Sequence, residues 1–363
     1  MAMGFSYLRF YQFRNIRDCR LEMGKKNVCF VGRNGQGKTN VLEAVYLLCY
    51  GSSFRTKQES LLIQHGSDEM SLSGHVNNSD NDLQLDVRIQ NNKKSIFVDD
   101  CFVADRRDIV ENVPCIVFCH DDIDFVNGTP DKRRWFFNQT MSMGEPLFIN
   151  YLRTYSRILK SRNQLLKETS HNSDLLEVYD TQLAEAGIAI QQKRKLIIDA
   201  FNKNFENLFQ EISELPYGLL IDYKPSWTTE DGITGAMHEL KRKRDTDTRI
   251  GTTTTGPHRD KMVYTANASD FTLTASTGQL RLLSLILRVA QARYIAELAG
   301  IKPVLLLDDV LLELDPQRRK KFMLYLPQYL QAFYTFLPDE QFSQYISGDT
   351  LVYEVKNGEF GLQ

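Results

Sequence analysis

The chain has 363 residues, with 44 basic and 46 acidic side chains and therefore a formal net charge of −2. A hydrophobic content of 42% is enough for a folded core and excludes a wholly disordered chain. No segment approaches the roughly 18 consecutive apolar residues of a membrane span, and the first residues lack the pattern of a secretory signal, so we expect a cytoplasmic protein without a membrane partner. Because the charges nearly balance, nucleic-acid binding would require a local basic surface.

The first third of the chain predicts strands around one glycine-rich turn. Residues 5–31 alternate and then run apolar to end in NVCFV, which is typical of strands of which the last is buried. GRNGQGKT follows, and apolar residues then recur at helical spacing in NVLEAVYLLCYG. Residues 71–118 hold short β-like runs separated by Asn, Asp and Ser clusters.

The middle of the chain has a helical pattern. Apolar residues recur every three or four positions over 152–166 and again over 176–212, which predicts two amphipathic helices in a hairpin or helical lobe. Residues 175–212 contain no proline and would span roughly 55 Å as one helix. The composition is loop-like at 225–235, basic at 241–244 and rich in Gly and Thr at 251–256, and another helical pattern begins near Gln279.

The segment GRNGQGKT at residues 32–39 fits the phosphate-binding pattern G-x-x-x-x-G-K-[ST]. In this pattern backbone N–H groups surround the phosphates, Lys38 reaches the β- and γ-phosphates, and the hydroxyl of Thr39 ligates Mg²⁺. A glycine-rich turn without a ligand is the alternative, but it does not explain why Lys38 and Thr39 occur together. The predicted ATP-binding residues are Gly32, Arg33, Asn34, Gly35, Gln36, Gly37, Lys38 and Thr39.

The run VLLLDD at residues 304–309 predicts a buried parallel strand that ends in two acids. P-loop proteins use such a strand to bring a carboxylate to the Mg²⁺, a role that suits Asp308. Asp309 then stands where a carboxylate orients the attacking water, so Lys38 and Asp309 are the catalytic candidates and Thr39 and Asp308 the Mg²⁺ ligands. The alternative is a strand that simply ends in two surface acids.

A second motif opens the helix before this strand. Ser276, Gly278 and Gln279 form a Ser-x-Gly-Gln turn, which by itself also fits an ordinary helix N-cap. The order of P-loop, Ser-x-Gly-Gln turn and acidic strand resembles that of ABC-type ATPases. In those proteins the turn contacts the γ-phosphate held by the partner subunit, so the resemblance implies a homodimer formed with ATP.

Taken together, these motifs resemble the RecF family of bacterial DNA repair proteins over nearly the whole chain. The most specific match is GPHRD at residues 256–260. The resemblance implies an α/β fold: a P-loop, SMC-like ABC-type ATPase head (1–118 and 251–363) with an inserted, mostly helical lobe (119–250). The other matching segments are Phe13–Asn15, Asn40–Ala44, Ser53–Arg55, Asp122–Arg134, Leu159–Asn163, Tyr179–Ala184, Ala275–Arg281 and Leu307–Arg319.

The same resemblance implies a function. It points to an ATP-driven dimer that closes on DNA at single-strand gaps or junctions, works with RecR- and RecO-type mediators, and assists RecA loading and SOS induction near the nucleoid. The family's Asp-Asp pair replaces the Asp-Glu pair of other ABC enzymes, so we expect weak, DNA-stimulated ATP hydrolysis. Thr335 stands where ABC proteins sense the γ-phosphate, and the sequence leaves its role open.

No motif identifies a DNA-binding surface, and nothing indicates sequence-specific readout. Local basic stretches are the candidates, because contact with backbone phosphates needs only positive charge. Solvated helix faces are the alternative for each of them. The residues proposed to contact DNA are Arg153, Arg157, Lys160, Lys193 and Arg194.

Three other classes share some of these features. The ATPase subunit of another ABC-type complex, such as a membrane transporter, has the same three ATP motifs but rarely such an insert. A chromosome-organising SMC protein needs far longer coiled-coil arms. A P-loop kinase acts as a monomer and does not need the Ser-x-Gly-Gln turn.

Overall fold

The computed structural model describes residues 3–77, 82–105, 107–110, 113–168, 173–228, 230–298, 300–340 and 349–363. The chain forms two compact units: unit 1 comprises Met1–Asp121 with Gln291–Gln363, and unit 2 comprises Asp122–Ala290. Residues 251–290 thus lie in unit 2, whereas the sequence-based division assigns them to the head. Within the described residues, no helix is both long and apolar enough to span a membrane.

Unit 1 contains a largely parallel sheet with the strand order β15-β14-β3-β13-β12-β8. Every residue of β3, β8, β12 and β13 is buried, as expected for parallel strands covered on both faces. This confirms the buried strands predicted from NVCFV and VLLL. The strands are β3 (Asn27–Val31), β8 (Cys115–Phe118), β12 (Val304–Leu307), β13 (Gln331–Phe336), β14 (Thr350–Lys356) and the antiparallel β15 (Glu359–Leu362).

A second sheet of unit 1 is antiparallel, in the order β2-β1-β4-β5-β6-β7. Helix α1 (Lys38–Tyr50) packs on strands of both sheets, and all its residues from Val41 onward are buried. A helix that is buried on every side is a core helix, so α1 occupies the interior of unit 1 although it contains the charged Glu43. The remaining elements are β1 (Gly4–Tyr11), β2 (Cys19–Glu22), β4 (Met70–Asn77), β5 (Asp82–Gln90), β6 (Lys93–Val98), β7 (Cys101–Phe102), α2 (Arg107–Val110) and α9 (Pro316–Tyr325).

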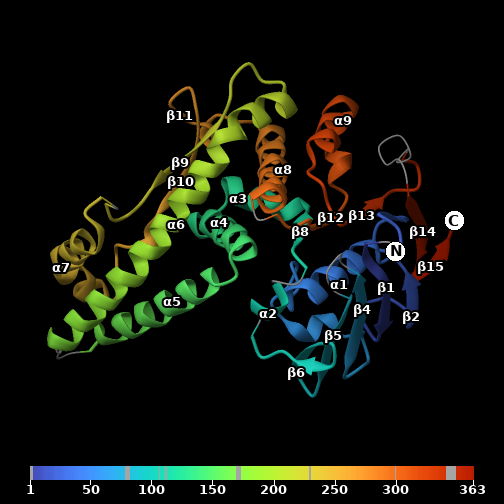
Figure 1. Cartoon of the computed structure of the whole chain (residues 1–363), viewed down its shortest axis with the longest axis horizontal. Coiled ribbons are helices and arrows are strands. Elements are labelled where there is room, and N and C mark those ends of the chain that lie inside the picture. The colour runs from blue at the N-terminus through green and yellow to red at the C-terminus, as the bar shows by residue number, and fades with distance from the viewer. Residues whose placement is uncertain are drawn as a thin grey trace. The chain divides into compact units, whose positions relative to one another are not determined.

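Unit 2 is built around α6 (Ser173–Ser213), an unbroken helix of 41 residues. Helices α5 (Phe148–Leu165) and α7 (Gly232–Ile250) pack against it, and Figure 1 shows α5 lying along α6. The predicted long helix and its shorter companion are confirmed. The other elements are α3 (Asp124–Asn127), α4 (Pro130–Gly144), α8 (Thr277–Arg293) and a three-stranded sheet of β9 (Leu220–Lys224), β10 (Lys261–Ala266) and β11 (Ser269–Asp270).

Helix α7 covers a segment whose sequence predicts loop followed by basic residues. Only Ala236, Leu240 and Asp247 of this helix are buried, so it has too few apolar positions for a visible helical period. The helix ends at Gly251, which has a φ of 72° and supplies the left-handed conformation common after a last turn.

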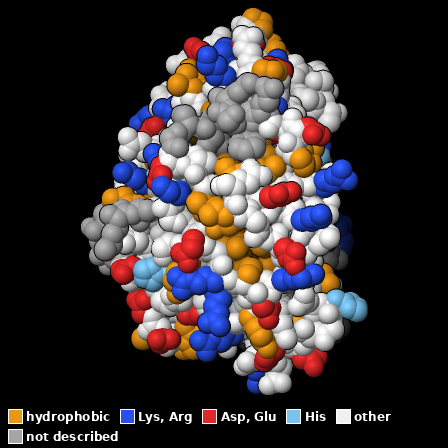
Figure 2. All heavy atoms as spheres, turned by 90° about the vertical axis from the view of Figure 1, so that its right-hand side faces the viewer, with side chains coloured by type: hydrophobic (Ala, Val, Ile, Leu, Met, Phe, Trp, Pro, Cys, Tyr) orange, Lys and Arg blue, Asp and Glu red, His pale blue; other side chains and the backbone are white. Residues whose placement is uncertain are grey.

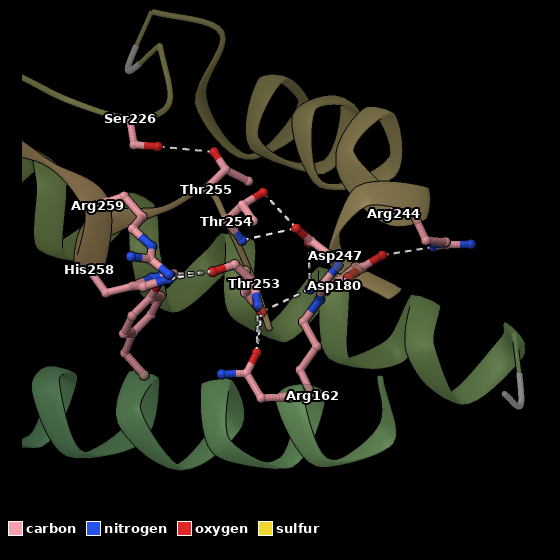
Figure 3. A network of polar contacts seen from close by, with 12 residues as sticks. Arg162, Asp180, Ser226, Arg244, Asp247, Thr253, Thr254, Thr255, His258 and Arg259 are labelled. Carbon is pink, nitrogen blue, oxygen red and sulfur yellow. Dashed lines mark hydrogen bonds and ion pairs between the residues drawn. The ribbon is translucent and has the colours of Figure 1, made fainter. Parts of the chain in front are cut away.

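A buried charge network joins the three long helices of unit 2 (Figure 3). Arg162 of α5 donates from Nε to Asp180 of α6 over 2.7 Å and from Nη1 to Asp247 of α7 over 2.8 Å. Nη1 also donates to the hydroxyl of Thr253, and Arg244 of α7 pairs with the other oxygen of Asp180. One fully buried guanidinium therefore fixes the positions of α5, α6 and α7 relative to one another.

Replacing Arg162 with leucine leaves Asp247 without its cation and Asp180 with Arg244 alone. We expect the free energy of unfolding of unit 2 to fall by about 3–5 kcal/mol, the usual cost of breaking a buried ion pair. The measurement is urea unfolding followed by tryptophan fluorescence.

Both tryptophans of the chain, Trp135 and Trp227, lie in unit 2, so this signal reports on that unit. The matched control is Arg157→Leu, which removes an exposed arginine from the same helix and is expected to leave the unfolding curve unchanged. Equal stability of the Arg162 variant and the wild type would show that the network does not hold the helices together.

Candidate nucleotide-binding site

The site is formed where the parallel strands of unit 1 end. Strand β13 lies between β3 and β12 and is parallel to both, so the carboxyl ends of the three strands share one edge of the sheet. The P-loop follows β3, the acidic pair follows β12, and Thr335 lies near the end of β13. Ligands of open α/β sheets bind at this kind of edge.

The P-loop has the backbone that its glycines allow. Gly35 and Gly37 have φ values of 77° and 115°, a region that other residues rarely adopt. A Cβ on Gly32 would lie 2.4 Å from the carbonyl oxygen of Val355, so only glycine fits there. Lys38 is buried, and its Nζ donates to the carbonyl oxygen of Gly32 over 2.7 Å. The loop thus holds its ammonium group at the N-terminus of α1, where an anion is favoured.

Two distant segments support this loop. The backbone N–H groups of Asn357 and Gly358 donate to the side-chain and backbone oxygens of Gln36, over 2.7 and 2.9 Å. On the other side, the amide of Asn15 donates to the carbonyl oxygen of Gly35. A Cβ on Gly358 would lie 2.0 Å from the backbone oxygen of Asn15, so the two supporting segments also touch. The sequence pattern of the C-terminal hairpin does not indicate this contact.

A buried carboxylate, Glu43 of α1, connects three of the family-like segments. Arg14 forms a bidentate pair with it, with N–O distances of 2.9 and 2.7 Å. Ser53 donates to the same carboxylate over 2.5 Å, and Arg55 lies 3.3 Å from it. Arg55 also donates to the side-chain oxygen of Asn40. These residues thus form an ion-pair cluster at the first turns of the P-loop helix.

The predicted Mg²⁺ ligands lie together. Thr39 donates from Oγ1 to Oδ1 of Asp308 over 2.8 Å, although 269 positions separate the two residues. Burial raises the pKa of Asp308 to about 6; the charge of Asp309 acts in the same direction, while hydrogen bonds from Thr39 and Thr335 oppose it. A hydroxyl and a carboxylate supply the hard oxygen ligands that Mg²⁺ prefers, and a cation would favour the ionised acid. The donor set therefore fits this metal.

The predicted catalytic carboxylate, Asp309, is held by Thr335. The backbone N–H of Asp309 donates to the hydroxyl of Thr335 over 2.7 Å, and that hydroxyl lies 2.7 Å from Oδ1 of Asp309 and 3.1 Å from Oδ1 of Asp308. Asp309 has a φ of 53°, a strained conformation for a residue other than glycine. Thr335 thus positions both acids, and neither strand pattern nor spacing indicates this role.

The Ser-x-Gly-Gln turn lies in unit 2 at the start of α8. The side-chain oxygen of Gln279 accepts from the N–H of Ser276, and the hydroxyl of Ser276 accepts from the N–H of Gln279. This reciprocal pair is a capping box, so the ordinary N-cap interpretation is correct as far as it goes. It does not explain Gly278, which is exposed, has no positive φ and would place a Cβ no closer than 4.0 Å to the hydroxyl of Ser276.

The DNA candidates differ in exposure and in pairing. Arg153, Arg157 and Lys160 are exposed on α5, whereas Lys193 forms an ion pair with Glu145 at 2.7 Å. On the face of the molecule in Figure 2, basic and acidic side chains are interspersed.

The proposed contact of Arg194 with DNA needs correction. Its side chain is buried and donates to Asp260 and to the backbone oxygen of Pro257, over 2.7 and 2.6 Å. Because its charge is paired inside unit 2, Arg194 is a packing residue.

The GPHRD segment also serves packing. The carboxylate of Asp260 accepts hydrogen bonds from Arg194, Gln191, Tyr223 and the N–H of Ser226. Both oxygens of the carboxylate are therefore satisfied, which accounts for the burial of this acid.

Two other GPHRD residues, Gly256 and His258, pack closely beside this network. A Cβ on Gly256 would lie 2.6 Å from the hydroxyl of Tyr155. His258 lies between that hydroxyl and the carbonyl oxygen of Thr253 (Figure 3), and burial lowers its pKa to about 4. The imidazole is therefore neutral at pH 7.

Replacing Thr335 with valine keeps the shape of the side chain and removes its hydroxyl. The N–H of Asp309 then loses its acceptor, so we expect its amide hydrogen to exchange about tenfold faster, the equivalent of about 1.4 kcal/mol. Hydrogen exchange with mass spectrometry on peptides covering 304–314 measures this. Thr335→Ser restores the hydroxyl and is expected to restore slow exchange; equal rates in all three proteins would refute the role of Thr335.

Comparison with known proteins places this site in a family. Residues 5–358 match the family described as RecF/RecN/SMC N terminal domain. The chain is 40% identical to the DNA replication and repair protein RecF of Treponema pallidum over 347 residues, covering 95% of this chain and 97% of that protein. It is 30% identical to the RecF protein of Leptospira interrogans serovar copenhageni over 347 residues, covering 95% and 94%.

Comparison with solved structures leads to the same family. A structure of the recombination mediator protein RecF with ATP, from the RecFOR pathway, superposes with a TM-score of 0.90 at 28% identity, covering 100% of this chain and 98% of that one. An SMC head bound to the C-terminal winged-helix domain of ScpA superposes with a TM-score of 0.58 at 15% identity, covering 99% and 97%, and shows a shared fold alone. The chain therefore belongs to the RecF family, and its fold is that of an SMC-like ATPase head.

Proposed function

We propose that this protein is an ATP-dependent DNA-binding protein of recombinational repair and replication. The observation that carries the proposal is the arrangement at the strand ends of unit 1, where the P-loop, Thr39 and the two acids after β12 meet. The family adds to it, because the relatives are named as DNA replication and repair proteins and a structural neighbour holds ATP as a recombination mediator.

In the proposed mechanism, the P-loop amides and Lys38 bind the phosphates of ATP, and Thr39 and Asp308 hold Mg²⁺. When bound, the metal offsets negative charge on the phosphates. Asp309 orients the attacking water. Its carboxylate is shorter than glutamate and is already bonded to Thr335, so it reaches less far and is less free to accept a proton. We therefore propose slow hydrolysis, which suits a switch.

The exposed turn at the start of α8 is proposed to complete the nucleotide site of a second subunit. Its capping box presents Ser276, Gly278 and Gln279 in an ordered conformation. Since packing within the chain does not require glycine at 278, the absence of a side chain is best explained by the close approach of another molecule. ATP bound between two subunits would then stabilise a homodimer by mass action.

The proposed dimer closes on DNA, at single-strand gaps or junctions, through backbone phosphates. It would act with RecR- and RecO-type mediators in loading RecA and in SOS induction, within the cytoplasm at the nucleoid. The exposed basic side chains of α5 (Arg153, Arg157 and Lys160) are proposed to contact the DNA backbone, and contacts with phosphates carry no sequence information.

Replacing Gly278 with alanine separates the structural and functional roles of the turn. Inside the chain the new methyl group has space and favours helix by up to about 1 kcal/mol, so the melting temperature is expected to stay equal or rise. In the dimer the methyl group would face the partner's nucleotide. We expect the dissociation constant of the ATP-induced dimer, from light scattering over a range of protein concentrations, to increase about tenfold or more, equivalent to about 1.4 kcal/mol.

The matched control is Thr277→Ala, which changes an exposed neighbour in the same turn and should leave dimerisation intact. If the Gly278 variant dimerises like the wild type, the turn does not contact a partner's nucleotide.

The wild-type protein should change its mass in solution with nucleotide. With ATP and Mg²⁺ we expect the 41.9 kDa chain to double in mass and to co-elute with a gapped duplex in light scattering. Lys38→Met should abolish both effects, because the phosphates lose their cation. A wild-type protein that binds ATP but remains a monomer and ignores DNA would contradict the proposed clamp.

A further inference from the structure

A groove of about 660 Å³ runs between α5 and α6 on the surface of unit 2. The two helices are antiparallel, because Tyr151 of α5 lies beside Lys193 of α6, with 5.8 Å between the ring centre and Nζ, while Arg162 bonds Asp180. Tyr151 lines one end of the groove and Tyr179 the other. Along α6 these ends are about 20 Å apart.

The floor and the walls of the groove differ in chemistry. The floor of the groove between the two tyrosines is formed by the small side chains of Ala186 and Ala189 of α6. Tyr151 is 40% exposed, so part of its side chain is accessible to a ligand, although Lys193 lies over its ring. The wall of α6 also carries Glu185, and the wall of α5 carries Arg157.

A stripe of positive charge follows the groove on α5. Arg153, Arg157 and Lys160 are spaced by four and three residues, which places them in one row along the helix, and all three are exposed. Arg157 belongs both to this row and to the lining of the groove. It forms no ion pair within the part of the chain that the structure describes, so its charge is available to a ligand.

The groove is held in shape from its opposite side. Arg162, Asp180 and Asp247 lie on the core sides of their helices (Figure 3), where they fix α5 against α6 and α7. The helix faces that line the groove take no part in this network. A ligand would therefore meet a rigid surface and would not have to order it.

We propose that this groove binds single-stranded DNA, with phosphates along the basic row of α5 and bases over the alanine floor between Tyr151 and Tyr179. The proposal rests on the DNA-binding function proposed above and names the strand and the surface.

The chemistry favours an unpaired strand over two other partners. A duplex hides its base faces by stacking, so it could use the basic row but not the exposed ring of Tyr151, whereas unpaired bases stack on aromatic side chains. An acidic peptide would also match the basic row, but its Asp and Glu side chains have no flat rings to place on Tyr151. An exposed aromatic ring, a floor of small alanine side chains and a row of positive charge on one side together fit a single polynucleotide strand best.

The test is fluorescence anisotropy of labelled (dT)20 with the full-length protein at several salt concentrations. Arg157→Gln is expected to weaken binding and to lower the slope of log Kd against log salt by about 0.7, the value for one phosphate contact on a single strand. Tyr151→Ala is expected to weaken binding about fivefold or more, the lower end of the range for one base stacked on an aromatic ring.

Three controls make the result specific. Lys203→Gln removes an exposed cation elsewhere on α6 and should not change the affinity. Glu185→Gln removes the acid of the groove and should strengthen binding. An oligonucleotide of the same length without bases should bind the wild type more weakly than (dT)20, and this difference should be smaller for Tyr151→Ala. Melting temperatures confirm that each variant is folded.

The outcomes separate this inference from the proposed function. If the wild type binds a gapped duplex with ATP and Mg²⁺, but the Arg157 and Tyr151 variants bind (dT)20 like the wild type, the groove is not the site and only the inference is wrong. The same holds if the base-free oligonucleotide binds as well as (dT)20, or if a glutamate 20-mer displaces (dT)20 at equal concentration, which would assign the groove to an acidic peptide. If the wild type binds no DNA of any kind, the proposed function itself fails.

Discussion

The nucleotide site depends on one constraint: β13 must lie between β3 and β12 so that Thr39 can meet Asp308. The two residues belong to opposite ends of the sequence, and no local interaction brings them together. What brings them together is the burial of three apolar parallel strands, which is favourable only when both faces of the sheet are covered. Thr335 uses the same geometry, because it lies on the central strand and reaches the acids that follow its neighbour. The chemistry of the site is thus a consequence of strand order.

The P-loop is supported by electrostatics as well as by packing. Glu43 is fully buried inside α1, where an unpaired carboxylate would be unstable, and Arg14 and Arg55 supply the compensating charge. Arg14 comes from the turn after β1 and Arg55 from the segment after α1, so the pairing fixes both segments beside the loop. Gln36 is fixed in a similar way by the C-terminal hairpin. Several residues of the family-like segments therefore act by shaping the loop.

Local signals predict part of this molecule and long-range pairing decides the rest. The P-loop, the strands on either side of the site and the long helix α6 follow from glycine spacing and hydrophobic period, which are properties of short segments. Helix α7 escapes prediction because its buried side includes Asp247, a charge that only Arg162 of another helix makes tolerable. Arg194 looks like part of a basic patch for the converse reason: its partner Asp260 is 66 positions away. A buried ion pair is hard to predict from a sequence because each charged residue, taken alone, has the pattern of a surface residue.

Two ion-pair networks of unit 2 also explain what the GPHRD segment, the most specific motif of the sequence, does in the fold. Asp260 and His258 meet α6 and α5 at the level of Arg194 and Tyr155, and Arg162 joins the same helices farther along. Ion pairs buried at two positions along the helices can both form in only one helix register. A shift by one turn would leave unpaired charges in the interior. The core sides of α5 and α6 are therefore committed to structure. Their outer sides, with the exposed row at Arg153, Arg157 and Lys160, are the surfaces that this rigid pair presents to other molecules.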